Sequence, residues 1–515
     1  MPDSFTRDPA HRGLRLLGGD YVVAAITLLT CAAHLALAGR YDIFRNELYF
    51  IVCGWRPAFG YADQPPLAPL IAAATQTFGE NVWLLRLPAA LAATALVPVA
   101  AAFARLLGGD RISAILAAAG AALSPALAGL TTTTTTATFE PIAWTLCAYF
   151  VTRGVMKTDG KAFIWAGLVA GLAMETKYGV AIWLIALGAG LLSTKVRAIF
   201  AERRFWIALG VGGLIAAPSL VWQAMRGWPF LEVIGHHNSA KTIFTGTPLE
   251  FAVGQFAAMN IALAPLWLAG VIAPFLSARL APARFLAIAF VGSAFIVYVG
   301  GGKDYYLFPA YPTMFAVGAA ACAGLRTALV GVWLGVATLV ALILAPVAMP
   351  LLDPPALAAY LAATHLRPAP DEAAAVGAPL TQVFSDEQGW RELERRVAAV
   401  YRALPADEKP RVTILASNYG EAAAIDVYGR ADHLPPAVSG QNQYYLWGPG
   451  DGDDRVIIHV NGDPERWRQL CRSLDVADTF GAPYAMPYEN DRPIMICRGF
   501  RADLSSTWER FKRYQ

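Results

Sequence analysis

The sequence is poor in charged residues. Asp, Glu, Lys and Arg make up 15% of its 515 residues, against about a quarter in an ordinary soluble domain, while 56% are hydrophobic and the mean hydropathy is +0.44. This composition excludes an ordinary soluble enzyme and predicts a membrane protein. The net charge is only +3, which gives no reason to expect nucleic acid as a partner.

Cysteine is also scarce, with six residues and no CxxC pair, so a zinc site is not expected. Four of the six lie in or beside apolar runs, where packing is their simplest role. Cys471 and Cys497 lie in the polar C-terminal part, where they can form a disulfide if that part faces an oxidising compartment. No metal-ligand constellation stands out, and we expect neither a metal nor another cofactor.

Long apolar runs fill the first 351 residues. A membrane helix needs about 20 mostly apolar residues, and on this measure we expect a polytopic α-helical membrane domain over 1–351 with about 11 transmembrane helices. The candidates lie at 20–39, 83–105, 112–130, 138–153, 162–175, 178–194, 205–222, 250–275, 285–300, 311–325 and 329–350.

Basic residues are divided unevenly between the loops that join these runs. With the N-terminus in the cytoplasm, the inside segments hold fifteen Lys and Arg residues and the outside loops hold seven. Because loops rich in Lys and Arg stay in the cytoplasm, we expect a multi-pass protein of the cell inner (plasma) membrane with a cytoplasmic N-terminus. An odd number of spans then places the C-terminal part in the periplasm.

The C-terminal part, 352–515, has the composition of a soluble domain. Its expected elements are a helix at 385–404, a strand at 411–416, a helix at 419–428, a strand at 455–460, a helix at 464–473 and a strand at 494–497. Ser385 and Gln388 match a capping box at the start of the first helix. The alternation of helices and strands predicts a small extracytoplasmic α/β domain.

One outside loop, 40–82, stands out from the others. It is long, aromatic and acidic, and Gly and Pro interrupt it too often for a membrane span. The other outside loops include 223–249 and the threonine run 131–136, which we interpret as a spacer. The inside loops are short and basic, so we expect any chemistry on the outer face.

Transfer of a sugar from a lipid phosphate to a hydroxyl needs a carboxylate that takes the proton and cations that stabilise the departing phosphate. The outside loops carry both kinds of residue. Candidate carboxylates are Asp42, Glu47, Asp63 and Glu140, and candidate cations are Arg45, Arg56, Lys177, Lys241 and Lys303. In the C-terminal part, Tyr444, Tyr445 and Trp447 can stack on a sugar, but such aromatics are more often core residues.

Each candidate has a structural alternative. Glu47 lies among aromatic and apolar residues, as on a helix in the membrane interface, and this favours function. Asp63 either reacts or shapes the turn before two prolines, and Glu140 either reacts or sits at a helix N-terminus that favours an acid. Lys177 can simply extend to the interface, so Lys303, between glycines and tyrosines, is the better phosphate ligand.

Several of these segments resemble known motifs. RNELYFIVCGWRPAFGYADQPPLAPL (45–70) resembles the first outer loop of bacterial glycosyltransferases related to the protein O-mannosyltransferases and to the lipid A aminoarabinose transferase, a group similar to glycosyltransferase family 39. METKYG (174–179) and GGKDYYLFPAYP (301–312) resemble later motifs of this group. ILASNYGEAAAIDVYG (414–429) and SGQNQYYLWGP (439–449) resemble its members with a C-terminal outer domain.

The resemblance implies the GT-C fold, a polyprenyl-phosphate-linked sugar donor and inversion at the anomeric carbon. Glu47 matches the acid of the group's acidic pair, Asp63 the acid of its Gly-Tyr-x-Asp-x-Pro-Pro element, and Lys303 the lysine before the tyrosines. Asn46 departs from the pattern, since relatives commonly have Asp there. Either Glu47 or Asp63 is then the base.

We therefore expect an integral-membrane glycosyltransferase that moves a sugar to a hydroxyl of an envelope lipid, glycan or protein. Lys303, helped by Lys177 and Arg56, stabilises the departing polyprenyl phosphate. Further candidate substrate-binding residues are Tyr61, Glu140, Tyr305 and Tyr306. The alternatives are a transporter or flippase of lipid-linked sugars and a non-catalytic envelope assembly protein. The first is disfavoured because the ionisable residues gather at the outer ends of spans and no internal repeat is visible.

Overall fold

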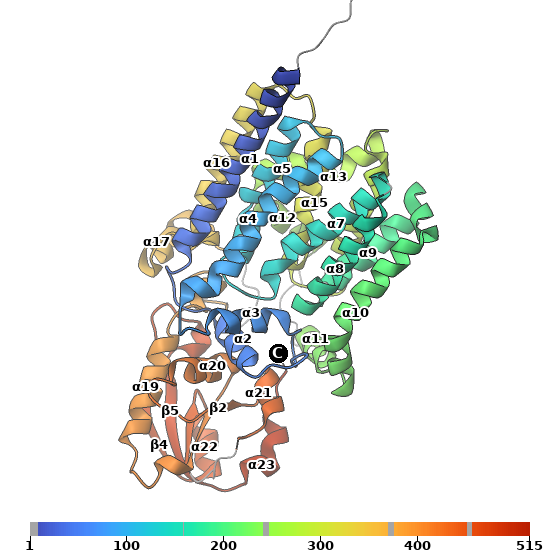
Figure 1. Ribbon diagram of the computed structural model, residues 1–515. Coiled ribbons are helices and arrows are strands. Elements are labelled where there is room, and N and C mark those ends of the chain that lie inside the picture. The colour runs from blue at the N-terminus through green and yellow to red at the C-terminus, as the bar shows by residue number, and fades with distance from the viewer. Residues whose placement is uncertain (1–8, 158, 240–246, 369–374, 451–455, 515) are drawn as a thin grey trace, which may run out of the picture.

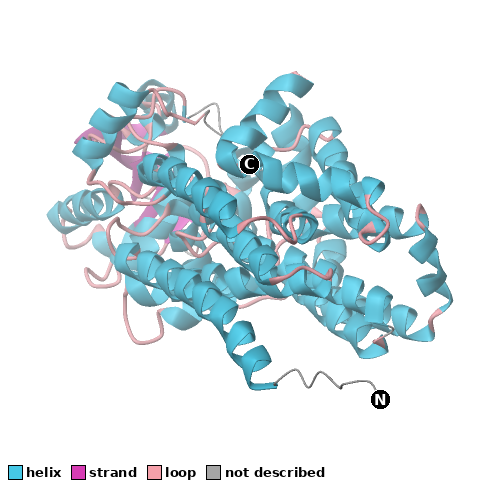
Figure 2. Ribbon diagram, turned by 90° about the horizontal axis from the view of Figure 1, so that it is seen from above, coloured by secondary structure: helices cyan, strands magenta, loops and turns pink. Residues whose placement is uncertain are grey.

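The structure of the protein, a computed structural model, describes residues 9–157, 159–239, 247–368, 375–450 and 456–514. Figure 1 shows a body of long helices and, at one end of it, a smaller part that contains a five-stranded sheet. Figure 2, at right angles to this view, shows the strands on one side of the molecule and helices through the rest. The predicted class, helical with a small C-terminal α/β part, is confirmed at this level.

The helical body follows the apolar runs of the sequence. Its helices are α1 (Pro9–Leu37), α4 (Val82–Leu106), α5 (Arg111–Ala122), α6 (Pro125–Leu130), α7 (Glu140–Lys157), α8 (Gly160–Thr176), α9 (Val180–Leu192), α10 (Arg203–Met225), α12 (Pro248–Ala258), α13 (Ala264–Leu276), α14 (Arg284–Val299), α15 (Tyr311–Ala321) and α16 (Thr327–Ala348). By length and composition, four single helices of the described chain are suited to cross a membrane, or six if two bent pairs each form one span. The chain is a multi-pass helical protein, and the number of eleven spans stays a prediction.

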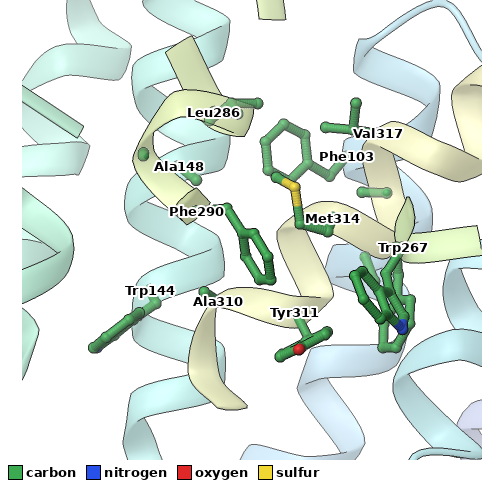
Figure 3. Packing of buried hydrophobic residues seen from close by; sticks show 14 of the residues in the cluster. Phe103, Trp144, Ala148, Trp267, Leu286, Phe290, Ala310, Tyr311, Met314 and Val317 are labelled. Atoms are coloured by element: carbon green, nitrogen blue, oxygen red, sulfur yellow. The ribbon is translucent and has the colours of Figure 1, made fainter. Parts of the chain in front are cut away.

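One large apolar cluster holds the helical body together. Figure 3 shows Phe103 of α4, Phe290 of α14 and Met314 of α15 packed side by side in its centre. The Trp144 ring stacks on that of Trp183 with 5.5 Å between centroids. Such dense packing of rigid helices fixes the positions of the segments that connect them.

The first outer loop contains two short helices, α2 (Arg45–Trp55) and α3 (Leu67–Thr75), at the boundary between the helical body and the sheet (Figure 1). Leu48 and Ile51 of α2 are fully buried in an apolar cluster that also contains residues of the C-terminal part. Glu47, expected on a helix in the membrane interface, thus lies on a helix that is largely covered by protein.

Two other outside segments contain short helices. Segment 223–249, expected as a loop, forms α11 (Pro229–Ser239), and Lys241 in its second half lies outside the described residues. The segment that contains Lys303 continues as a 3-10 helix, η5 (Asp304–Ala310). The loop prediction for 223–249 missed α11 because this helix has only four apolar residues at helical spacing, Phe230, Leu231, Val233 and Ile234.

The C-terminal part combines helices with a mixed sheet. Its helices are α17 (Pro354–Thr364), α18 (Gln382–Ser385), α19 (Trp390–Ala403), α20 (Tyr419–Tyr428), α21 (Asn442–Trp447), α22 (Pro464–Leu470) and α23 (Leu504–Thr507), and its strands are β1 (Val412–Ala416), β2 (Ala437–Ser439), β3 (Val456–Val460), β4 (Cys471–Phe480) and β5 (Arg492–Phe500). The strand order is β2-β1-β3-β5-β4. Because β1 is parallel to both β2 and β3, the loops that follow these three strands leave the sheet at one edge.

Several sequence predictions for this part are confirmed, and two differ from the structure. The helix predicted at 464–473 ends at Leu470, because β4 begins at Cys471. The helix at 419–428 and the three strands are present, with β3 beginning at Val456 because Arg455 lies outside the described residues. The helix predicted from Ser385 instead begins at Trp390. Ser385 ends α18, and Gly389 adopts φ +93° between the two helices, so the expected capping box does not form. Strands β2 and β4 were not predicted.

The two cysteines of the C-terminal part form a disulfide. Cys471 at the start of β4 is bonded to Cys497 in β5, with an S–S distance of 2.04 Å. The bond joins neighbouring antiparallel strands at the edge of the sheet that lies farthest from β2. The disulfide considered from the sequence is therefore present, and it fits a domain that folds in an oxidising compartment.

Candidate functional site

Asp63 lies where the first outer loop meets the C-terminal part. Its Oδ1 accepts a hydrogen bond of 2.8 Å from the Tyr49 hydroxyl, and its Oδ2 accepts one of 3.3 Å from Asn442 Nδ2. Burial raises the pKa of Asp63 to about 6, while these two hydrogen bonds act in the opposite direction. A carboxyl with such a pKa is mostly ionised at neutral pH and can still exchange a proton readily.

Tyr61 and Ala62 hold the loop that carries Asp63. The buried Tyr61 hydroxyl donates to the Cys53 carbonyl at 2.7 Å, and the Tyr61 carbonyl accepts from Gln223 Nε2 at 2.8 Å. Ala62 N donates to Gln443 Oε1 at 2.9 Å. Elements α2, α10 and α21 thus fix this loop from three sides, which is the kind of rigid support that a reacting group needs. Tyr61 is a structural residue of the loop in this arrangement.

Glu47 has a different environment. It is fully buried, its Oε1 accepts from Thr134 N at 2.7 Å, and its Oε2 accepts from Phe44 N at 3.0 Å. Oε2 also lies 3.1 Å from Arg86 Nη2. Both carboxylate oxygens therefore have firm protein donors. The threonine run is not a mere spacer, as the sequence suggested, because Thr134 holds Glu47 and the run itself is largely buried.

Sequence reasoning missed the buried Arg86–Glu387 pair beside Glu47. Arg86 Nη2 lies 2.9 Å from Glu387 Oε2, and the same guanidinium donates to the Ala38 and Asp42 carbonyls. Burial raises the pKa of Glu387 to about 8, Arg86 opposes this rise, and the Glu47 charge adds to it. A lone arginine inside the apolar run 83–105 was the available signal, since a charge in such a run needs a partner.

A second cluster brings together five of the predicted site residues. Lys177 Nζ lies 2.8 Å from Glu140 Oε2 and within 4.8 Å and 5.2 Å of the ring centroids of Tyr306 and Tyr305. Lys303, which is buried, has its Nζ 6.0 Å from the Tyr305 ring. The beginning of α7, the end of α8 and η5 thus place two lysines and two tyrosine rings next to one another, a combination suited to an anionic group.

Gly179 lies close to the Lys177–Glu140 pair. A Cβ at Gly179 would lie 2.8 Å from Glu140 Oε1, so a larger residue there would push the carboxylate away. The METKYG segment therefore supplies both the cation and the space for its partner.

Arg56 lies apart from both groups. Its side chain is exposed, and its guanidinium lies 4.5 Å from the ring centroid of Trp447. Tyr444 is buried and donates to Asp426 at 2.7 Å, which confirms the core role favoured for it. Tyr445, which stacks on Trp508, and Trp447 are only half-buried.

Contacts connect the loop of Asp63 with the lysine cluster. Gln223, which binds the Tyr61 carbonyl, also accepts from Phe230 N at 3.1 Å. The Phe230 ring lies 4.7 Å from the ring of Tyr178, the neighbour of Lys177. Both groups therefore occupy the same end of the helical body, next to α11 (Figure 1). Within the part of the chain that the structure describes, no group of three or more His, Cys, Asp and Glu side chains is arranged to hold a metal ion.

Comparisons with known proteins show which family and which fold this chain resembles. Residues 63–222 match the family model described as dolichyl-phosphate-mannose-protein mannosyltransferase. The crystal structure of ArnT from Cupriavidus metallidurans bound to undecaprenyl phosphate is similar to this chain, with a TM-score of 0.58 and 13% identity over 93% of this chain and 98% of that one. The apo structure of the same ArnT gives 0.57 and 14% over the same shares. No curated protein matches the sequence.

The matched segment 63–222 begins at Asp63 and contains Glu140 and Lys177. The shared fold covers the C-terminal part as well as the helical body, because 93% of the chain is aligned. The resemblance of this chain to the protein O-mannosyltransferase and lipid A aminoarabinose transferase group, and with it the GT-C fold, is confirmed.

Proposed function

We propose that this protein is an integral-membrane glycosyltransferase that moves a sugar from a polyprenyl-phosphate donor to a hydroxyl of an envelope lipid, glycan or protein. The observation that carries the proposal is the placement of Asp63 and of the Lys177–Lys303 cluster at one end of a helical body with the ArnT fold. Asp63 supplies a proton acceptor, and the lysine cluster supplies positive charge for a phosphate. The undecaprenyl phosphate in the ArnT structure supports the same class of donor.

Asp63 is the better candidate for the base. A hydroxyl of the acceptor gives its proton to the Asp63 carboxylate while its oxygen forms a bond to the anomeric carbon. Glu47 is less suited, because Arg86 and two backbone amides already occupy its oxygens. Attack from the side opposite the phosphate inverts the anomeric carbon.

The lysine cluster is the proposed site of the leaving group. The bond between the anomeric carbon and the phosphate oxygen breaks, and the electron pair leaves with polyprenyl phosphate. Lys303 and Lys177 stabilise the added negative charge, with Tyr305 and Tyr306 as neighbours. Arg56 is not part of this cluster, and its exposed guanidinium lies beside the Trp447 ring. Glu140 binds Lys177 in the structure and has to give way to the phosphate.

The membrane arrangement is part of the proposal. Residues 1–351 form the membrane domain with about 11 spans, and 352–515 form a periplasmic domain on the outer face of the inner membrane. The excess of Lys and Arg in the other set of loops supports this orientation. The Cys471–Cys497 disulfide supports an oxidising compartment for the C-terminal domain.

The test compares envelope lipids, glycans and glycoproteins by mass spectrometry in four strains: wild type, a deletion, and chromosomal Asp63→Asn and Glu47→Gln strains with matched protein levels. We expect one sugar-sized mass to disappear in the deletion and the Asp63→Asn strain, and to persist in the Glu47→Gln strain. That mass identifies both the sugar and the acceptor. A deletion that leaves all envelope masses unchanged contradicts the transferase, and an unchanged Asp63→Asn strain contradicts the base.

A further inference from the structure

We infer that Asn442, in the C-terminal domain, is a positioning residue that aims the Asp63 carboxylate and keeps it ionised. This inference rests on the proposed function, in which Asp63 takes the acceptor proton. The inference makes the C-terminal domain part of the site, whereas the other proposed site residues belong to the helical body and the first outer loop.

The position of Asn442 follows from the topology of the sheet. Strands β1 and β2 are parallel, and Asn442 lies three residues after the end of β2, at the edge where both strands finish. In open α/β sheets this edge carries the residues that contact ligands. Here the edge is turned towards α2 and the loop of Asp63, as the contacts below show.

Two neighbouring residues of α21 form hydrogen bonds both with the loop that carries Asp63 and with α2. Asn442 Nδ2 donates to Asp63 Oδ2 at 3.3 Å, and Gln443 N donates to the Tyr49 hydroxyl at 3.0 Å. The same hydroxyl donates to Asp63 Oδ1 at 2.8 Å. Gln443 Oε1 accepts from Ala62 N, directly beside Asp63. Each oxygen of Asp63 thus has a donor that α21 either supplies or orients.

Asn442 is itself held firmly. Its side chain is 1% exposed, it adopts φ +49°, and its backbone N–H donates to the Arg513 carbonyl at 3.0 Å. Asparagine tolerates this left-handed conformation better than most residues. A buried amide in a fixed backbone can direct its N–H with little freedom, which is the requirement for a residue that positions another.

The charge state of Asp63 depends on few neighbours. The titratable groups that interact with it are Tyr49 and Cys53 of α2 and Tyr514 of the C-terminal segment, all neutral near pH 7 because burial raises their pKa values. Burial favours the neutral carboxyl, so the amide of Asn442 is one of the few groups that favour the ionised form. Loss of this amide should therefore raise the pKa of Asp63.

The first measurement is a double-mutant cycle on the full-length protein in detergent. Unfolding midpoints are compared for wild type, Asp63→Ala, Asn442→Ala and the double variant. We expect the double variant to lose less than the sum of the single losses, because the two side chains stabilise each other. Asn490→Ala is the matched control, since this amide binds the Ala485 carbonyl within its own loop, and its loss should add to that of Asp63→Ala. Additive losses for Asn442→Ala would overturn the inference.

The second measurement is the pH dependence of transfer. Membranes of a deletion strain supply the donor and the acceptor, and mass spectrometry follows the sugar added by each purified variant. For Asn442→Ala we expect the acidic limb of the rate profile to move to a pH about one unit higher. At a pH below this limb, the fraction of ionised Asp63 should then be about tenfold lower than in wild type. At higher pH the rate should recover towards that of wild type. Asn490→Ala should keep the wild-type profile.

The results separate the inference from the function on which it rests. Coupling together with a displaced acidic limb supports the inference, and coupling with an unmoved limb overturns it. If wild-type protein transfers no sugar, or Asp63→Asn transfers it at the wild-type rate, the proposed function or its base fails. The double-mutant cycle still decides in that case whether Asn442 and Asp63 interact.

Discussion

The ammonium of Lys177 and the carboxylate of Glu140 form an ion pair, 2.8 Å apart, between the end of α8 and the beginning of α7. The pair is mostly shielded from solvent, since the side chains are 19% and 4% exposed, and two tyrosine rings lie beside the cation. An anion that binds Lys177 therefore competes with a resident carboxylate. If polyprenyl phosphate binds Lys177 as proposed, this competition should weaken its binding before and after the reaction and favour product release.

Glu140→Gln tests this competition directly. With the carboxylate neutralised, Lys177 is free of its strongest described partner and should bind polyprenyl phosphate about tenfold more tightly, since a charge-assisted contact contributes about 1.4 kcal/mol. Turnover should fall because the product leaves slowly. The measurement is product inhibition by added polyprenyl phosphate, with the exposed Glu465→Gln as control. Weaker inhibition in Glu140→Gln would contradict the competition.

Lys303→Ala should reduce turnover far more than stability. In the proposed mechanism this lysine stabilises the charge that develops on the leaving phosphate, a role whose loss lowers kcat by about a hundredfold. The unfolding midpoint should change less than turnover, because Lys303 lies in the segment before η5 and is not part of the large apolar cluster. Transfer assays and thermal unfolding of the same preparation check this, with the exposed Lys161→Ala as comparison. Normal transfer by Lys303→Ala would remove this residue from the mechanism.

Glu47→Gln should show the opposite pattern. Glu47 and Glu387 share Arg86, and removal of one charge leaves the buried guanidinium incompletely paired, at a cost of about 3 kcal/mol in the free energy of unfolding. Transfer per folded molecule should fall much less than in Asp63→Asn. Thermal unfolding and transfer rates normalised to folded protein distinguish the two effects. A fully stable but inactive Glu47→Gln protein would return the role of base to Glu47.

The pH dependence of stability should report on Glu387. Its pKa is about 8 in the folded protein and near 4.5 in the unfolded chain, so the folded state holds an extra proton between these values. The stabilisation from this group is therefore complete below about pH 4.5 and is lost as the pH rises to about 8. Unfolding midpoints of wild type should fall over this window, and those of Glu387→Gln should fall less. Equal slopes for the two proteins would contradict the assignment.

The sequence predicted those features that depend on local patterns. Apolar runs located the helices of the body, and alternation located α20, β1 and β3, because burial periodicity and capping are properties of neighbouring residues. The break at Gly389 was missed, since a capping box at Ser385 looked consistent with its own surroundings. Glycosyltransferase motifs likewise identified Asp63, Lys177 and Lys303 as candidates.

The partners of these residues could not be predicted from the sequence. Glu387 is 301 positions from Arg86, and Asn442 is 379 positions from Asp63, distances over which no periodicity carries information. The apolar neighbours of Glu47 in the sequence suggested a reactive carboxylate. In the structure, however, hydrogen-bond donors contact both of its oxygens. Only the folded chain shows that Glu47 is paired with a buried arginine, whereas Asp63 is held by neutral donors.

The hydrogen bond from Asn442 to Asp63 has a consequence for the order of synthesis. A ribosome makes Asp63 early, and the first outer loop reaches the far side of the membrane long before residue 442 has been translated. Until the later domain has folded and docked, Asp63 lacks one of its two side-chain donors and the loop lacks its α21 contacts. In the proposed mechanism the nascent membrane domain is therefore an incomplete catalyst, and folding of the C-terminal domain is the step that should activate it.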